Sequence, residues 1–149
     1  MLAEYHAAQR DRPVEVLGAD ERLEVELGGH HFVAVADVVL REGDGGVNSL
    51  RFLTTRQPPS VNDLAEGPGW GLLFEATRQR WPDEDVSVTM YSLRRQAGTR
   101  VRYPPQDLTK LLRRLARAAD RIRVATQFPA KTGMQCRWCR ARGRCPALK

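Results

Sequence analysis

One segment carries apolar side chains on both faces of a strand, and it restricts the fold more than any other feature of the sequence. Residues 31–41 read HFVAVADVVLR, so Phe32 begins one alternating apolar set and Val33 begins the other. A strand with two apolar faces belongs inside a sheet that is covered on both sides. The segment therefore predicts a central strand in a sheet flanked by helices.

The elements around this strand alternate between strand-like and helix-like patterns, separated by glycine-rich and proline-rich stretches. The predicted elements are a helix over residues 2–10, strands over 22–27, 31–41 and 48–55, a helix over 70–81, strands over 86–94 and 99–103, and a helix from Pro105 with Asp107 as its N-cap. This order predicts one α/β domain over residues 1–149, with a central mixed sheet and an irregular cysteine-rich tail over 128–149.

The long helix after Pro105 has two distinct faces. Its apolar residues follow helical spacing, and they are Leu108, Leu111, Leu112, Leu115, Ala119 and Ile122. Its basic residues share the opposite face, and they are Lys110, Arg113, Arg114, Arg117 and Arg121. We expect the apolar face to pack against the sheet. The basic face is either a solvated helix surface or a contact for a phosphate backbone.

Charge is divided unevenly along the chain. Residues 1–74 contain 6 arginines and 12 acidic residues, a net charge of −6, whereas residues 75–149 contain 18 basic and 6 acidic residues, a net charge of +12. Arg94, Arg95, Arg100 and Arg102 near the second predicted hairpin, and Arg137 and Arg140 in the tail, extend the basic set. A basic half can bind DNA without base specificity, or simply serve solubility, and an acidic half can contact a protein partner.

Two classes of protein are excluded by pattern. No apolar run approaches the roughly 18 residues of a membrane span, and the first residues, MLAEYHAAQRDRP, lack the apolar core of a secretory signal. The three cysteines are an odd number, crowded into the last 14 residues, so they do not form a disulfide framework. We therefore expect a protein of the reducing cytoplasm.

The tail carries the spacing of a metal or cluster site. Cys136 and Cys139 are separated by two residues, and Cys145 follows with Pro146 after it. Two thiolates at this spacing chelate one ion from a tight turn, and a third can close over it. The tail therefore predicts zinc or an iron–sulfur cluster. Both kinds of site take four ligands and no fourth cysteine is present, so a reduced tail without metal is the alternative.

The segment from Phe128 to Pro146, FPAKTGMQCRWCRARGRCP, closely resembles the C-terminal end of RecB-like nucleases of the PD-(D/E)XK superfamily. This group includes the AddB nuclease domain and CRISPR-associated RecB-like exonucleases. The order of the upstream strands also resembles the family, and the resemblance covers residues 15–147. It implies a restriction-endonuclease-like core that hydrolyses DNA with a divalent metal. It also implies a cysteine cluster whose first ligand lies N-terminal to that core.

By this resemblance Asp37 falls on the metal-binding aspartate of the family, and it is the only catalytic candidate retained. Phe52 stands where the second carboxylate is expected, and Thr54 stands where the family has a lysine. Arg56 is a nearby cation, and it supplies no carboxylate. A lone Asp37 is alternatively a hydrogen-bonded structural residue. Because a divalent ion needs at least two carboxylates here, Mg²⁺ or Mn²⁺ is not expected to bind.

Two further positions of the family motif are also altered. Trp70 and Phe74 take the places of a glutamine and a tyrosine at the start of the next helix. His6 is the only candidate for the N-terminal histidine of the family, in a context that does not match. We interpret these replacements together as a catalytically degenerate relative.

The sequence leaves three functions open. The leading one is a sequence-independent DNA-binding or scaffold subunit in bacterial DNA processing, repair or defence, with a helicase, nuclease or other DNA-processing subunit as its protein partner. The second is a metal-dependent DNA exonuclease completed by a partner chain or by an N-terminal segment. The third is a protein-interaction module that does not bind DNA.

Overall fold

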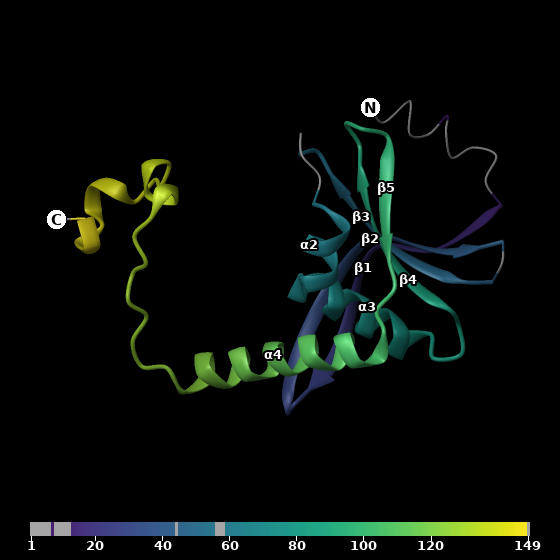
Figure 1. The fold of residues 1–149 in the computed structure, drawn as a ribbon, viewed down its shortest axis with the longest axis horizontal. Helices are drawn as coiled ribbons and strands as arrows, with labels where there is room; N and C mark the ends of the chain where they lie inside the picture. Colours follow the sequence, from purple (N-terminus) through teal and green to yellow (C-terminus); the bar gives the residue numbers. More distant parts are fainter. Residues whose placement is uncertain (1–6, 8–12, 44, 56–58, 149) are drawn as a thin grey trace. The chain divides into compact units, whose positions relative to one another are not determined.

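A five-stranded mixed sheet organises the computed structural model, which describes residues 7, 13–43, 45–55 and 59–148. The strands are β1 (Val14–Leu27), β2 (His30–Glu42), β3 (Val47–Leu53), β4 (Val86–Ser92) and β5 (Ala97–Val101). They lie in the order β1-β2-β3-β4-β5, and of the four neighbouring pairs β3–β4 alone is parallel. The helices are α2 (Val61–Glu66), α3 (Pro68–Arg80) and α4 (Pro105–Val124) (Figure 1). The predicted α/β fold with a central mixed sheet is confirmed.

The contacts of the chain divide it into two compact units, residues 1–119 and residues 120–149. The first unit holds the sheet, α2, α3 and most of α4. The second holds the end of α4 and three short 3-10 helices, η1 (Met134–Arg137), η2 (Arg142–Arg144) and η3 (Pro146–Leu148). All described residues of the second unit are exposed or half-buried, so its apolar side chains have no core of their own. None of the helices in the described part of the chain is long and apolar enough to cross a membrane.

Helix α3 covers the sheet and supplies much of the core. Gly67 is its N-cap and Pro68 follows at the first helical position, where the missing N–H of proline costs no hydrogen bond. The helix contacts β1, β2, β3 and β4, and all its residues from 71 to 77 are buried. The Thr77 hydroxyl lies 2.7 Å from the Ser49 hydroxyl on β3, in a fully buried hydrogen bond. This bond fixes α3 against the middle of the sheet.

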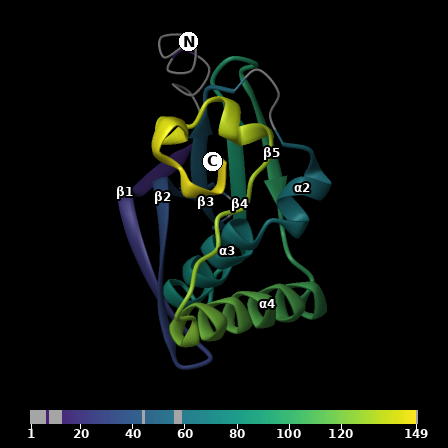
Figure 2. The same cartoon turned by 90° about the vertical axis from the view of Figure 1, so that its left-hand side faces the viewer.

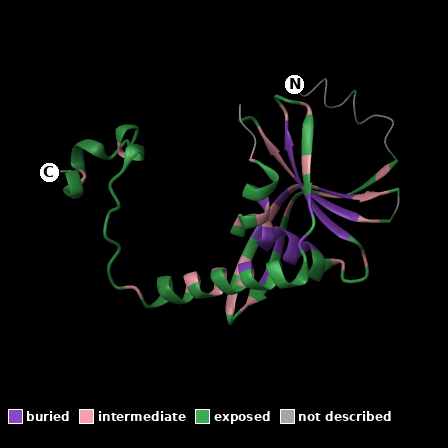
Figure 3. Ribbon diagram, viewed as in Figure 1, coloured by how far each residue is buried: buried purple, intermediate pink, exposed green. Residues whose placement is uncertain are grey.

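Helix α4 packs on the core through its first half. Leu108 and Leu111 are buried, and a Cβ on Gly71 would lie 2.6 Å from Leu111 Cδ2, so α3 and α4 touch closely there (Figure 2). Ala116 meets the β1–β2 turn, where a Cβ on Gly28 would lie 3.0 Å from its own Cβ. Ile122 is 65% exposed. The apolar face predicted over residues 108–122 is therefore buried at Leu108 and Leu111 and exposed at Ile122 (Figure 3).

The strand that is buried at every position is β4 rather than β2. All seven residues of β4 are buried, whereas Val33 on β2 is 37% exposed. The prediction that the residue 31–41 strand is covered on both faces is therefore wrong for its first half. The physical reason is local: β3 leaves β2 beyond Val38, as described below, and uncovers this stretch.

Several element boundaries differ from those predicted. The strand predicted over residues 22–27 extends back to Val14, because a register shift between Val16 and Gly18 lets β1 continue through an irregular stretch. Helix α4 starts at Pro105, and the Leu108 N–H donates to the Pro104 carbonyl at 3.0 Å, so Asp107 lies in the first turn and is not the N-cap. The helix predicted over residues 2–10 lies, apart from Ala7, outside the described residues.

The two halves of α4 give a direct test of this packing. We expect Leu111→Ala to lower the free energy of unfolding by about 2–5 kcal/mol, because it opens a cavity between α3 and α4. Ile122→Ala on the same helix is expected to change it by about 0.5 kcal/mol or less. Urea unfolding followed by circular dichroism measures both values. Equal losses for the two variants would contradict the packing of the helix through its first half.

Candidate functional site at the strand fork

Strands β2 and β3 separate within the sheet, and this fork positions the candidate site. The β2–β3 ladder pairs residues 38–41 with residues 47–50 and stops at Val38 and Leu50. Beyond that point β3 continues with β4 as its neighbour, from Arg51 to Leu53. The earlier part of β2 pairs with β1 instead. Two strands that part in this way leave backbone and side-chain groups facing a gap between them.

A local distortion marks the corner of the fork. The β1–β2 ladder pairs Ala19 with Val38 and Glu21 with Ala36, and Asp20 between them has a φ of 56°. On β2 the fully buried positions step from Ala36 to Val39, which breaks the two-residue alternation of a strand. Asp37 stands at this break. The Asp37 side chain therefore points toward β3 and does not follow the alternation of the other β2 side chains.

The Asp37 carboxylate bonds β3 where the ladder has ended. Its Oδ2 accepts a hydrogen bond from the Phe52 backbone N–H at 2.6 Å. Its Oδ1 lies 3.2 Å from Arg51 Nε in an ion pair. The Arg51 Nη1 donates to the Val35 carbonyl oxygen at 3.0 Å, so this guanidinium crosses the gap back to β2. The Asp37 carboxylate and the Arg51 side chain together join the two arms of the fork.

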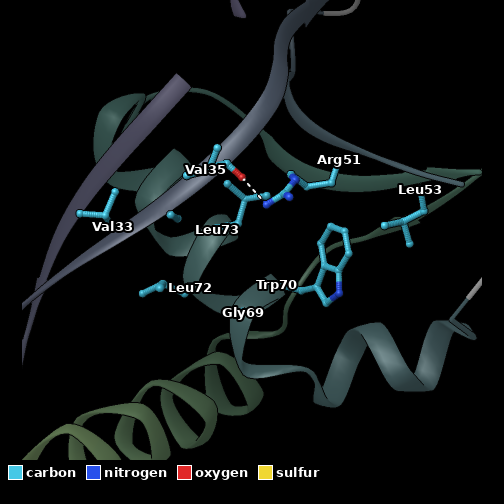
Figure 4. Close-up of a pocket in the computed structure, with 9 residues that line it drawn as sticks. Val33, Val35, Arg51, Leu53, Gly69, Trp70, Leu72 and Leu73 are labelled. Carbon is cyan, nitrogen blue, oxygen red and sulfur yellow. Dashed lines mark hydrogen bonds between the residues drawn. The ribbon is translucent and has the colours of Figure 1, made fainter. Parts of the chain in front are cut away.

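A pocket of about 370 Å³ lies between the arms of the fork and the start of α3 (Figure 4). Its walls are mostly apolar, and the residues that line it are Val33, Ala34, Val35, Arg51, Leu53, Gly69, Trp70, Leu72 and Leu73. The Arg51 side chain and the Trp70 ring both reach into the space between β2 and α3. No acidic residue contributes to this lining. The pocket suits an apolar or aromatic group better than a hydrated metal ion.

The structure brings together a different set of residues from the one the sequence predicted. Arg51, not Phe52, is the β3 side chain beside Asp37, since neighbouring residues of a strand point to opposite faces. The Phe52 ring lies against Tyr91 instead, with 6.1 Å between ring centroids. Thr54 is exposed and follows the end of β3. Sequence reasoning missed Arg51, because the choice between Arg51 and Phe52 depends on the register between β2 and β3, which local patterns do not give.

The remaining predicted positions are only partly gathered at the fork. Trp70 lines the pocket, whereas Phe74 is buried against Tyr103, with 5.2 Å between ring centroids. Burial raises the pKa of Tyr103 to about 12. Its hydroxyl donates to the Leu64 carbonyl at 2.6 Å, so the ring pair belongs to the core. His6 and Arg56 lie outside the described residues.

Helix α4 presents its predicted basic residues to solvent. Lys110, Arg113, Arg114 and Arg117 are exposed and line one shallow groove along the helix. Arg121 is exposed one turn further on. Among the described residues, none of these five has a carboxylate partner in an ion pair. Their charge is therefore available to an external anion.

The other predicted basic residues are not gathered with those of α4. Arg94 and Arg95 are exposed in the turn between β4 and β5, and β5 separates that turn from the start of α4. On β5 and just after it, Arg100 pairs with Glu42, and Arg102 pairs with Asp85 at 2.6 Å. Those two charges are already balanced. Arg137 and Arg140 are exposed in the second compact unit.

The three cysteines are free thiols in a chain of short turns. Cys136 and Cys145 are half-buried and Cys139 is exposed. Cys136 Sγ accepts from the Gly133 N–H at 3.4 Å, and the Cys139 N–H donates to the Cys136 carbonyl at 3.4 Å. Thiolates suit zinc or a cluster, but within the described residues no three potential ligands are gathered as a metal group. The donor chemistry fits such a group, whereas the ligand set is incomplete.

Comparison with known proteins decides the family. The model of the PD-(D/E)XK nuclease superfamily matches residues 1–146. The chain belongs to the PD-(D/E)XK nuclease superfamily. The fold is also similar to that in the crystal structure of SSO0001, at 18% sequence identity and a TM-score of 0.51, covering 99% of this chain and 68% of that one. No curated protein matches the sequence.

Nucleases of the PD-(D/E)XK superfamily use a divalent metal, and the residues at the fork can be compared with what such a metal needs. Mg²⁺ and Mn²⁺ take oxygen ligands, usually with more than one carboxylate in a nuclease site. Here Arg51 and the Phe52 N–H already engage both oxygens of Asp37, and no three potential metal ligands are gathered among the residues that the structure describes. The residues present therefore do not fit the metal.

These contacts predict a structural role for Asp37. We expect Asp37→Ala to lower the free energy of unfolding by about 1–3 kcal/mol, because it removes the acceptor of the Phe52 N–H and the carboxylate that pairs with Arg51 Nε. Glu24→Ala, which removes an exposed carboxylate paired with His31, is the control and is expected to cost about 0.5 kcal/mol or less. Urea unfolding measures both. A neutral Asp37→Ala would show that the carboxylate does not hold the fork.

Proposed function

We propose that this chain is a catalytically inactive, RecB-like member of its superfamily that binds DNA without sequence preference. It acts as a DNA-binding or scaffold subunit beside a helicase, nuclease or other protein of bacterial DNA processing, repair or defence, in the cytoplasm. The observation that carries the loss of catalysis is the contact between Arg51 and Asp37. A guanidinium lies beside the carboxylate that a metal-dependent nuclease leaves free for its ion.

The RecB-like assignment is supported by the tail. Cys136, Cys139 and Cys145 with the preceding Phe128 and following Pro146 reproduce the pattern that the sequence shares with that group. The free state of all three thiols agrees with a ligand role. The assignment thus depends on the tail, whereas the superfamily assignment rests on nearly the whole chain.

The DNA surface is proposed to be the basic face of α4. Lys110, Arg113, Arg114 and Arg117 follow a spacing of three or four residues, which places them on one side of the helix. Unpaired cations along one helix face attract phosphates and release counterions when DNA binds. Binding of this kind is sensitive to salt and indifferent to base sequence.

The test compares two double variants with the same change in net charge. Arg113→Gln with Arg117→Gln removes two cations from the basic face. Arg22→Gln with Arg80→Gln is the matched control, because these two arginines line a hollow together with Glu21 and Glu24 and lie outside the basic face. Fluorescence anisotropy with labelled single- and double-stranded DNA, over a salt series, gives the affinity. The slope of log K against log salt is expected to fall by about two for the α4 variant and to stay unchanged for the control.

The same DNA samples test for catalysis on a denaturing gel with Mn²⁺. We expect a gel shift without cleavage. Cleavage that Asp37→Ala abolishes would instead establish a metal-dependent exonuclease completed by residues outside the fork. Neither shift nor cleavage would favour a protein-interaction module, for which the exposed apolar residues of the second unit are the supporting observation. Those residues are Ile122, Val124, Phe128, Met134 and Trp138.

A zinc ion or an iron–sulfur cluster at the tail is a separate proposal. Its support is the three free thiols at cluster-like spacing, and it requires a ligand from outside that set. Protein purified without oxygen is expected to contain zinc, or iron with acid-labile sulfide, at about one site per chain. Cys139→Ser is expected to lower this content, whereas Met134→Ala, also in the tail, is not. Finding neither zinc nor iron in the wild type would overturn the proposal.

A further inference from the structure

The second compact unit, residues 120–149, carries more net positive charge than the whole chain. It contains 8 basic side chains and 1 acidic side chain, a net charge of +7, whereas the full chain carries +6. The acidic residue, Asp120, already pairs with Arg123 at 3.6 Å. Among the described residues, four exposed arginines of the tail have no carboxylate partner, and they are Arg137, Arg140, Arg142 and Arg144. Their charge attracts a polyanion.

An exposed tryptophan stands within this run of arginines. Trp138 is 74% exposed, directly after Arg137 and two residues before Arg140. Its backbone N–H donates to the Gln135 carbonyl at 3.2 Å, which fixes the residue at the end of η1. Within the described part of the chain, its ring contacts neither another aromatic ring nor a guanidinium. An indole left in water beside cations indicates a ligand that carries both flat rings and negative charge.

We propose that Trp138 and the tail arginines form a binding site for single-stranded nucleic acid. An unpaired base stacks on the indole ring, and the neighbouring phosphates meet Arg137 and Arg140. The site uses residues other than those of the basic face of α4. It extends the proposed DNA-binding function to unpaired strands.

The chemistry of stacking favours an unpaired strand over a duplex. In a duplex the faces of each base are covered by its neighbours, so an indole reaches a face only by inserting between base pairs and unstacking them. In a single strand the faces are open, and every base offers one regardless of sequence. Phe128 is 73% exposed in the same unit and supplies a second ring of this kind. The tail therefore suits single strands without base preference.

The charge of the unit favours a nucleic acid over a protein partner. A nucleic acid strand brings one phosphate per nucleotide and a base beside each phosphate. A protein could balance a net charge of +7 only with a strongly acidic surface, and carboxylates do not stack on an indole. A strongly acidic peptide is therefore the matched control ligand.

Intrinsic fluorescence tests the stacking directly in the full chain. The probes are an oligothymidylate of about 12 nucleotides and polyglutamate of the same formal charge. Oligothymidylate is expected to quench the tryptophan fluorescence of the wild type, and polyglutamate is not. Trp138→Phe is expected to lose the quenching, because only the half-buried Trp70 and Trp81 then report. Equal quenching by the two probes would overturn the proposal.

Affinities from fluorescence anisotropy separate stacking from charge. Trp138→Ala is expected to weaken the binding of labelled oligothymidylate about tenfold, and that of a labelled duplex about twofold or less. Trp138→Phe keeps a ring and is expected to retain most of the affinity. Met134→Ala removes another side chain of the tail, 68% exposed, and is expected to change neither affinity. Equal losses for single and double strands, or no loss in Trp138→Ala, would overturn the proposal.

The double variant Arg113→Gln with Arg117→Gln distinguishes failure of this site from failure of the DNA surface on α4. Duplex binding that this variant weakens, together with oligothymidylate binding that Trp138→Ala leaves unchanged, would retain the α4 surface and remove the tail site. Oligothymidylate binding that depends on Trp138, in a protein whose duplex affinity the double variant does not alter, would retain the tail site alone.

Discussion

The Asp37 carboxylate replaces the β-ladder at the point where β2 and β3 part, and the arrangement of the fork depends on this interaction. A backbone N–H of β3 that has lost its strand partner on this side is satisfied by a side chain instead, at 2.6 Å. The same carboxylate fixes Arg51, which returns to β2 through the Val35 carbonyl. The pocket between the arms of the fork and the start of α3 is lined by Val35 and Arg51, whose hydrogen bond joins the two strands there.

The general fold was readable from the sequence because each element carries its own local pattern. The alternation in β2 and β4, the proline start of α4 and its leucine spacing all act over a few residues. Burial was less predictable, because it depends on which neighbour covers each face. Val33 belongs to an apolar alternation and yet is 37% exposed, since β3 has already turned away. Ile122 fits the leucine stripe of α4 and yet is 65% exposed.

The site was harder to predict than the fold because it depends on register between strands. Asp37 could be singled out as a carboxylate in an apolar strand. The side chain that pairs with Asp37 could be either Arg51 or Phe52. The choice depends on the break in strand alternation at Asp20 and Asp37. Such a break involves residues from β1, β2 and β3, and a shift of one position exchanges the two faces of a strand. Local sequence patterns carry little information of that kind.

Charge at the fork also bears on how DNA can approach this domain. In a metal-dependent nuclease the clustered carboxylates repel phosphate until a divalent ion neutralises them, so metal and DNA binding are linked. Here one carboxylate faces one guanidinium, and the pair is neutral without any ion. In the proposed DNA complex, the cations on α4 would meet a phosphate backbone without an opposing cluster of acidic residues in the lining of the pocket. Under the proposed function, an arginine in place of a metal ion would remove the reaction and make DNA binding independent of divalent ions.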